Sequence, residues 1–280
     1  MAANILHQRG NVQQPHAMKT VVYQSYRTTN VSPWITACMQ TVRAWAAANH
    51  FDYQFIDDRL FDYAPAWFRD KAAPHICPVT DLARLVLARQ LLAQGYERTV
   101  WVDADMVVFA PERLTVDVGN DFAFCHEVSL STNHDKQVGY VHNVNNSITI
   151  FTQGSATYLD FFIDACQRVA LNRPELGKLD VGTLFLTQLR SVLPFRLLGN
   201  VGMFSPHTMQ AIADGTEQYL RTYGQALKTP LACANLCGSL LGQQTDGITT
   251  DDRFYSAVVE KCMQTQGDVV NRFIGVGQPT

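Results

Sequence analysis

The sequence predicts an α/β fold in which a mixed, mostly parallel sheet is flanked by helices and followed by a helical C-terminal part. Strand-like and helix-like segments alternate up to about residue 110, which is the order that parallel sheets with crossover helices produce. The apolar run Thr99–Val102 ends at two carboxylates and has the character of a buried strand. At 280 residues, 47% of them hydrophobic, the chain can bury a sizeable core.

The first predicted elements are a strand, a helix and a second strand. Thr20–Tyr26 is rich in β-branched and aromatic residues, as strands are. Ser32 and Pro33 predict a helix start, with an N-cap serine and a proline in the first turn, and this helix extends to Asn49. Phe51–Ile56 alternates like a strand, and the proline-punctuated stretch 61–78 predicts a loop or short helical pieces.

The clearest helix begins at Thr80, its predicted N-cap, and ends at Gly95. Its leucines recur at helical spacing, and the strand that carries the carboxylates follows it directly. Beyond residue 110 we expect strands over 121–127 and 147–151, helices over 155–171 and 181–193, a strand over 195–204, and mostly helix from 207 to 264.

Composition excludes several classes of function. The net charge of −3 leaves no basic surface for nucleic acid, and no apolar stretch has the length of a transmembrane segment. The seven cysteines are scattered without a C-x-x-C pair, which favours reduced thiols in a cytoplasmic protein. Cys233 and Cys237 are expected to be small core residues of a helix, and residues 1–19 a disordered tail.

The strongest functional signal is the pair Asp103 and Asp105, with apolar residues on both sides. Uncompensated charges in such surroundings cost several kcal/mol. Two carboxylates at the end of a strand suit Mg²⁺ or Mn²⁺, and ligands of parallel sheets bind beyond the carboxyl ends of the strands. We therefore predict a divalent-cation site at this position.

The helix Thr80-Asp-Leu-Ala-Arg84, followed by the strand that ends in Asp-Ala-Asp, resembles the donor half of GT-A fold, DxD-containing glycosyltransferases. The resemblance is greatest to the retaining, glycogenin-like and lipopolysaccharide-glycosyltransferase-like families. It covers residues 20–110 well and 140–210 loosely. It implies a single GT-A-like domain over residues 20–280, with a nucleotide-sugar-binding half (20–115) and an acceptor-side half (116–280).

The activity implied by the resemblance is metal-dependent transfer of a hexose from a nucleotide sugar to a glycan, a lipid-linked or another hydroxyl acceptor. A UDP-sugar is favoured and a GDP-sugar is the second choice, with retention slightly favoured over inversion. The chemistry fits the residues, because a bound Mn²⁺ or Mg²⁺ neutralises the diphosphate leaving group.

The resemblance also implies roles for individual residues. Asp105 would ligate the metal, Asp103 would contact it through water or hold the ribose, and His207 is our first choice for a third ligand. The segment Ala232–Gly238 resembles a family segment that often carries a histidine, but it holds none. The remaining donor-side residues are expected to be Tyr23, Gln24, Tyr26, Arg27, Asp81, Arg84 and Ala104.

For the reaction centre and acceptor, the candidates are His142, Asn143, Asn145, Asn146 and Asp180, since amide side chains can bond sugar hydroxyls in both directions. Asp180, Asn146 and Arg84 are the predicted catalytic residues. In an inverting reaction Asp180 or Glu127 would be tested first as the base. His126 and His134, in the intervening loop, are further acceptor-facing candidates.

Two other classes of function stay open at this point. Nucleotidyltransferases that activate sugars share the strand–helix layout, although they usually carry a glycine-rich loop that Gln24–Asn30 lacks. A non-catalytic sugar-binding protein of the same fold is the other alternative.

Overall fold

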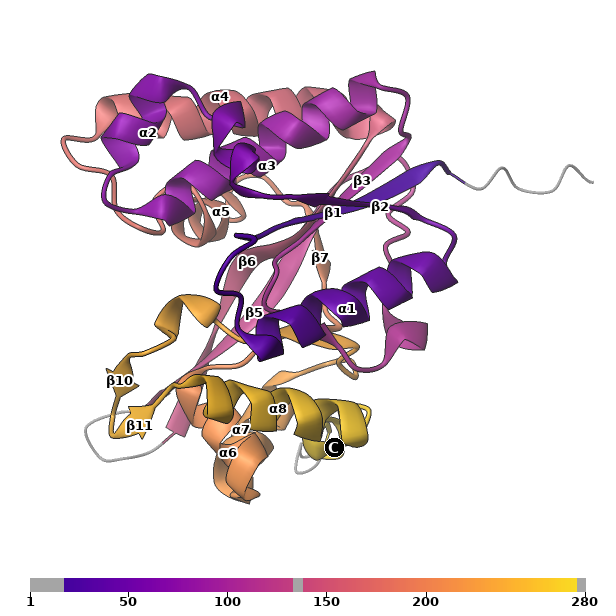
Figure 1. Cartoon of the computed structure of the whole chain (residues 1–280), viewed down its shortest axis with the longest axis vertical. Helices are drawn as coiled ribbons and strands as arrows, with labels where there is room; N and C mark the ends of the chain where they lie inside the picture. Colours follow the sequence, from indigo (N-terminus) through magenta and orange to yellow (C-terminus); the bar gives the residue numbers. More distant parts are fainter. Residues whose placement is uncertain (1–17, 133–137, 276–280) are drawn as a thin grey trace, which may run out of the picture.

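The computed structural model describes residues 18–132 and 138–275. Most of the tail expected over residues 1–19, and the candidate His134, therefore lie outside the described residues. Figure 1 shows a central sheet between two groups of helices.

The central sheet has six strands, and the predicted mixed, mostly parallel arrangement is confirmed. The pairs β1–β2, β1–β3 and β5–β7 are parallel, whereas β3–β6 and β5–β6 are antiparallel. In spatial order the strands are β2 (Asp52–Ile56), β1 (Thr20–Ser25), β3 (Arg98–Val102), β6 (Val138–Thr152), β5 (Ala123–Thr132) and β7 (Arg196–Leu198).

Successive residues of β1 and β3 face two different cores. Val21 and Tyr23 belong to the core shared with α3 and α4, whereas Val22 belongs to the core shared with α1. Both faces of these strands are buried, which explains their continuous apolar sequence. In Figure 1, α2 to α5 cover one face of the sheet, and α1 lies on the other side, towards α6, α7 and α8.

The bounds of the helices agree with most of the expected ones. They are α1 (Pro33–Ala48), α2 (Ala66–Ala72), α3 (Ile76–Ala93), α4 (Ala156–Asn172), α5 (Thr183–Leu189), α6 (Pro206–Asp214), α7 (Glu217–Ala226), α8 (Asp252–Gln264) and α9 (Asp268–Asn271).

One predicted helix start is wrong. The helix α3 begins at Ile76, with His75 at the N-cap position, so Thr80 is not the cap. Pro78 lies in the first turn, where its missing N–H is not needed, and the Thr80 hydroxyl instead donates to the Ile76 carbonyl. The predicted end is confirmed, because Gly95 has φ +95° directly after the helix.

The C-terminal part is less helical than predicted. Cys233 lies in strand β9 (Cys233–Asn235) and Cys237 has the left-handed φ of 53°, so neither is helical. A short continuous apolar run does not distinguish strand from helix, and here pairing decides. β9 lies between β4 (Met106–Val108) and β8 (Val201–Met203) in a second sheet, and β10 (Gln244–Thr245) pairs with β11 (Ile248–Thr249).

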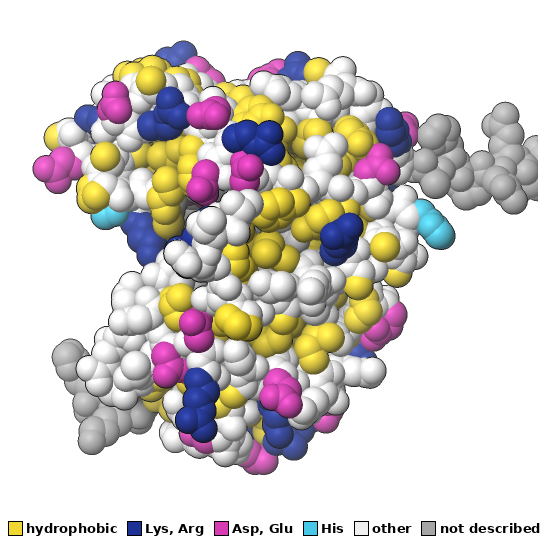
Figure 2. All heavy atoms as spheres, in the orientation of Figure 1, with side chains coloured by type: hydrophobic (Ala, Val, Ile, Leu, Met, Phe, Trp, Pro, Cys, Tyr) yellow, Lys and Arg dark blue, Asp and Glu magenta, His cyan; other side chains and the backbone are white. Residues whose placement is uncertain are grey.

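The strand predicted over 195–204 is divided between two sheets, as β7 and β8. Over the described residues, no helix combines the length and apolar character needed to cross a membrane. Figure 2 shows basic and acidic side chains interspersed on the face in view, so any argument from charge has to come from a local site.

Candidate active site

A cavity of about 670 Å³ lies where the carboxyl ends of the parallel neighbours β1 and β3 meet. Five parts of the chain supply most of its wall: the end of β1, the first turns of α3, the end of β3 with the turn to Asp105, the β6 asparagines and the segment after β9. The lining residues include Ser25, Tyr26, Arg27, Ile76, Cys77, Thr80, Asp81, Arg84, Asp103, Ala104, Asp105, Glu127, Asn145, Asn146, Lys178, Leu179, Asn235 and 237–240.

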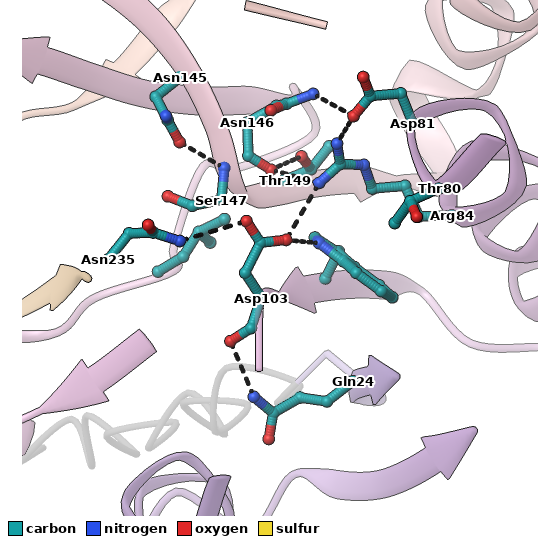
Figure 3. Close-up of polar contacts among 12 residues, drawn as sticks. Gln24, Thr80, Asp81, Arg84, Asp103, Asn145, Asn146, Ser147, Thr149 and Asn235 are labelled. Atoms are coloured by element: carbon teal, nitrogen blue, oxygen red, sulfur yellow. Dashed lines mark hydrogen bonds and ion pairs between the residues drawn. The ribbon is translucent and has the colours of Figure 1, made fainter. Parts of the chain in front are cut away.

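Asp103 lies at the centre of a hydrogen-bond network (Figure 3). Its Oδ1 accepts from Trp101 Nε1 at 2.6 Å and from Arg84 Nη1 at 3.2 Å, and its Oδ2 accepts from Asn235 Nδ2 at 3.3 Å. Gln24 Nε2 donates to its backbone carbonyl at 3.1 Å. The carboxylate is therefore fixed in orientation by donors from two strands, β3 and β9, and from helix α3, while Gln24 of β1 holds the backbone.

Asp105 is held by the segment that follows β9. Its Oδ1 accepts from Asn235 Nδ2 at 2.8 Å, and its Oδ2 accepts from the backbone N–H of Gly238 at 2.6 Å. A Cβ at position 238 would lie 3.0 Å from the Trp34 ring and 3.1 Å from Asp105 Oδ2, so glycine permits this close approach. The Asn235 amide thus donates to both carboxylates of the pair.

Arg84 connects the pair to α3. Its guanidinium forms an ion pair with Asp81 on the same helix and also donates to the Asn146 carbonyl at 2.9 Å. Asn146 Nδ2 in turn donates to Asp81 Oδ1 at 3.0 Å (Figure 3). Since Arg84 is only 4% exposed and Asp81 7%, these contacts are buried, and the structure brings the candidates Asp81, Arg84, Asn146 and Asp103 together.

The site has an excess of negative charge. Four lining carboxylates (Asp81, Asp103, Asp105, Glu127) face three lining cations (Arg27, Arg84, Lys178). Burial raises the pKa of Asp103 to about 7, with Asp105 adding to the rise and Arg84 opposing it. Burial also raises the pKa of Asp105, which hydrogen bonds from Gly238 and Asn235 oppose. A divalent cation would relieve this excess, so the donor chemistry fits Mg²⁺ or Mn²⁺.

The structure does not bring His207 to the carboxylate pair. His207 Nε2 lies 3.3 Å from Asp246 Oδ2, and its ring stacks on Tyr219. In the described ranges no group of three His, Cys, Asp or Glu side chains gathers as a metal site. The side chain that does lie against both carboxylates is Asn235, a neutral residue that the sequence analysis missed. The resemblance of segment 232–238 to a histidine-bearing segment was the available signal.

Asp180 also lies away from the cavity wall. Its Oδ2 accepts from the Gly177 backbone N–H at 2.8 Å and pairs with Arg173 Nη1 at 3.0 Å. The carboxylate therefore stabilises its own loop. The neighbouring Gly182 does matter to the site, because a Cβ there would lie 2.4 Å from Asp81 Oδ2.

The acceptor-side candidates divide into two groups. Asn145 and Asn146 line the cavity together with Glu127, whose Oε2 accepts from Asn145 Nδ2 at 3.0 Å. Asn143 does not line it but lies behind Glu127, with its Nδ2 3.5 Å from Oε1. His142 stacks on His126, with a ring-centroid distance of 4.8 Å, and neither lines the cavity.

The β1 candidates also divide into two groups. Tyr26 and Arg27 line the cavity, whereas Tyr23 and Gln24 are buried behind it. The Tyr23 hydroxyl donates to the Arg84 carbonyl at 2.9 Å. Tyr23 and Gln24 therefore hold Arg84 and Asp103 in place from behind the wall. Lys178 is a further lining residue that the sequence analysis missed, because nothing in its local sequence distinguishes it from a surface lysine.

No protein-family model and no curated protein matches this chain. Among solved structures, it is similar to a glycosyltransferase involved in glycosylation of the major capsid of PBCV-1 (9% identity, 86% of this chain and 98% of that one, TM-score 0.49). It is also similar to mouse xyloside xylosyltransferase 1 (10%, 79% and 98%, TM-score 0.40) and to the glycosyltransferase GlyE of Streptococcus pneumoniae (11%, 91% and 63%, TM-score 0.41). At these TM-scores, the activity has to be argued from the residues of this chain.

Proposed function

We propose that this protein is a metal-dependent glycosyltransferase that moves a hexose from a nucleotide sugar to a hydroxyl acceptor. The observation that carries the proposal is the partly buried pair Asp103 and Asp105, which share one amide donor at the carboxyl edge of a mostly parallel sheet. Burial raises the pKa of both carboxylates, so a bound divalent cation would stabilise their charged forms. A UDP-sugar is the favoured donor and a GDP-sugar the second choice.

In this proposal Asp103 and Asp105 hold the Mn²⁺ or Mg²⁺, and the Asn235 side chain lies beside it. When bound, the metal supplies Lewis-acid neutralisation of the diphosphate leaving group. Arg84 acts as a positioning residue, since its guanidinium bonds Asp103 Oδ1 and the Asn146 carbonyl. Tyr26 offers a partly buried ring beside the end of β1, where the nucleoside base would stack.

The acceptor would bind near Glu127 and Asn145, on the β5–β6 side of the cavity. The carboxylate of Glu127 accepts hydrogen bonds from Asn145 and from the Ser129 hydroxyl at 2.5 Å, so it is oriented without a cationic partner in the described contacts. In a retaining reaction, which we slightly favour, Glu127 would orient the acceptor hydroxyl. In an inverting reaction it is the better candidate for the base, because Asp180 does not line the cavity.

We further propose a cytoplasmic location, since all seven cysteines are free thiols.

The test is hydrolysis or transfer with a panel of UDP- and GDP-hexoses in the presence of Mn²⁺ or Mg²⁺. We expect metal-dependent release of UDP or GDP, abolished in Asp105→Ala. The matched control is Asp246→Ala, an exposed aspartate that faces His207 instead, which should keep full turnover.

Three outcomes would contradict the proposal. Absence of turnover with every donor, together with no metal-dependent nucleotide binding, would favour a non-catalytic protein. Release of pyrophosphate from a nucleoside triphosphate and a sugar 1-phosphate would instead identify a nucleotidyltransferase. Full activity of Asp105→Ala would remove the metal argument.

A further inference from the structure

The three cationic side chains that line the cavity differ in their hydrogen-bond and ion-pair partners. Arg84 is saturated by Asp81, Asp103 and the Asn146 carbonyl. Arg27 is exposed and lies over the Tyr26 ring at 5.4 Å. Lys178 is half-buried, and its ammonium donates to the Ser239 hydroxyl at 3.1 Å. Within the described ranges no ion pair joins Lys178 to a carboxylate, although the cavity wall contains four of them.

The contact with Ser239 places the Lys178 ammonium near the carboxylate pair. Ser239 directly follows Gly238, whose backbone N–H is bound to Asp105 Oδ2 at 2.6 Å. The ammonium also opposes the burial that raises the pKa of Cys77 and of Cys237, two thiols that line the cavity from α3 and from the segment after β9. Lys178 therefore faces the same cavity as Asp105 and contacts the segment that holds the Asp105 carboxylate.

The loop that carries Lys178 is well anchored. Asp180 accepts from the Gly177 backbone N–H and pairs with Arg173, so the backbone on both sides of Lys178 is held. Lys178 and Ser239 are 61 residues apart in the sequence, and their hydrogen bond joins the α4–α5 loop to the segment after β9. A half-buried lysine whose ammonium donates to a neutral hydroxyl can gain by exchanging that hydroxyl for an anion.

We propose that Lys178 binds the diphosphate of the nucleotide-sugar donor, exchanging the Ser239 hydroxyl for a phosphate oxygen when the donor enters. This inference rests on the proposed function, because it requires a nucleotide sugar at Asp103 and Asp105. Lys178 supplies positive charge from the α4–α5 loop, whereas the donor's nucleoside would lie at the end of β1. The charged residue that the α4–α5 loop presents to the cavity is thus Lys178, whereas Asp180, the predicted reaction-centre residue of this loop, does not line it.

The experiment compares binding of UDP and of uridine, each with Mn²⁺, to the full chain and to Lys178→Met, by calorimetry or ligand-observed NMR. GDP and guanosine are the second pair if UDP does not bind. We expect Lys178→Met to bind the nucleoside diphosphate about tenfold to hundredfold more weakly, which is the effect of one charge-assisted hydrogen bond, and to bind the nucleoside unchanged. Methionine retains most of the apolar stem, so packing is preserved.

Ser239→Ala is the matched control, because it removes the other half of the same contact without changing charge. We expect it to bind UDP as tightly as the unmodified protein, or up to about threefold more tightly, since the lysine no longer has to leave a partner.

The inference is overturned if Lys178→Met binds UDP normally, or if it loses UDP and uridine equally, which would indicate a disturbed cavity. It is also overturned if Ser239→Ala loses UDP affinity to the same extent, because the contact between the loops would then be what matters. In each of these cases metal-dependent UDP binding by the unmodified protein leaves the proposed function standing. If the unmodified protein binds neither UDP nor GDP, the proposed function itself fails.

Discussion

Arg84→Met should be the most damaging conservative substitution in the cavity wall. Arg84 is 4% exposed and neutralises Asp81 and Asp103 together, so its removal leaves two carboxylates and the Asn146 carbonyl without this partner. Breaking a buried ion pair from one side costs about 3–5 kcal/mol, because the remaining charge is uncompensated. For a chain of this size that corresponds to a fall in Tm of roughly 10 °C.

The loss of stability in Arg84→Met, relative to the unmodified protein, should depend on pH. The folded chain already binds a proton on Asp103 more tightly than the unfolded chain, with a pKa raised to about 7. Loss of Arg84, whose charge opposes that rise, raises it further. The folded variant then keeps this proton at a pH where the unmodified protein has lost it, so the stability lost in Arg84→Met shrinks as the pH falls to about 7 and levels off below, where Asp103 is protonated in both proteins.

Urea unfolding at pH 8 and at pH 6 measures both effects. The control is Arg89→Met on the same helix, whose ion pair with Asp160 (2.7 Å) is exposed and should contribute less than about 1 kcal/mol. The double variant Asp81→Asn/Arg84→Met should regain part of the lost stability, since one of the two orphaned charges is gone. The reasoning is refuted if Arg84→Met costs no more than Arg89→Met, or if the double variant is less stable than Arg84→Met alone.

Three shorter predictions concern the metal and the loop. The Mn²⁺ affinity, measured by calorimetry, should fall about fivefold between pH 7 and pH 6 as Asp103 takes up a proton, and a flat profile would exclude the carboxylate pair as ligands. His207→Ala should keep this affinity, whereas Asn235→Ala should weaken it by about tenfold; the reverse result would restore His207 as the ligand. Asp180→Ala should lower the free energy of unfolding by about 1–2 kcal/mol but leave kcat largely intact, and a lost kcat at unchanged stability would contradict its structural role.

The elements that the sequence predicts well are those specified by local signals. The continuous apolar runs of β1 and β3, the Ser32-Pro33 start of α1 and the glycine after α3 each act within a few residues, and the structure contains all of these elements. The position of Asp103 and Asp105 at the edge of the sheet follows from the same local pattern and from parallel topology.

The features that the sequence does not predict concern residues whose roles depend on partners far along the chain. β9 forms because β4 and β8 offer pairing edges on both sides, and only that pairing brings Asn235 against carboxylates 130 and 132 residues away. Conversely, Asp180 bonds its own loop and His207 faces Asp246, so neither completes the site that its residue type suggested.

By itself, therefore, the sequence determined the fold class and the location of the carboxylate pair, because periodicity, caps and buried charge are properties of contiguous residues. Only the tertiary structure decided which side chains surround that pair. Asn235 lies in β9 of the second sheet and Glu127 in β5 of the central sheet, whereas Arg84 lies in α3 and Lys178 in the α4–α5 loop. No local sequence pattern indicates that these four residues meet at one cavity.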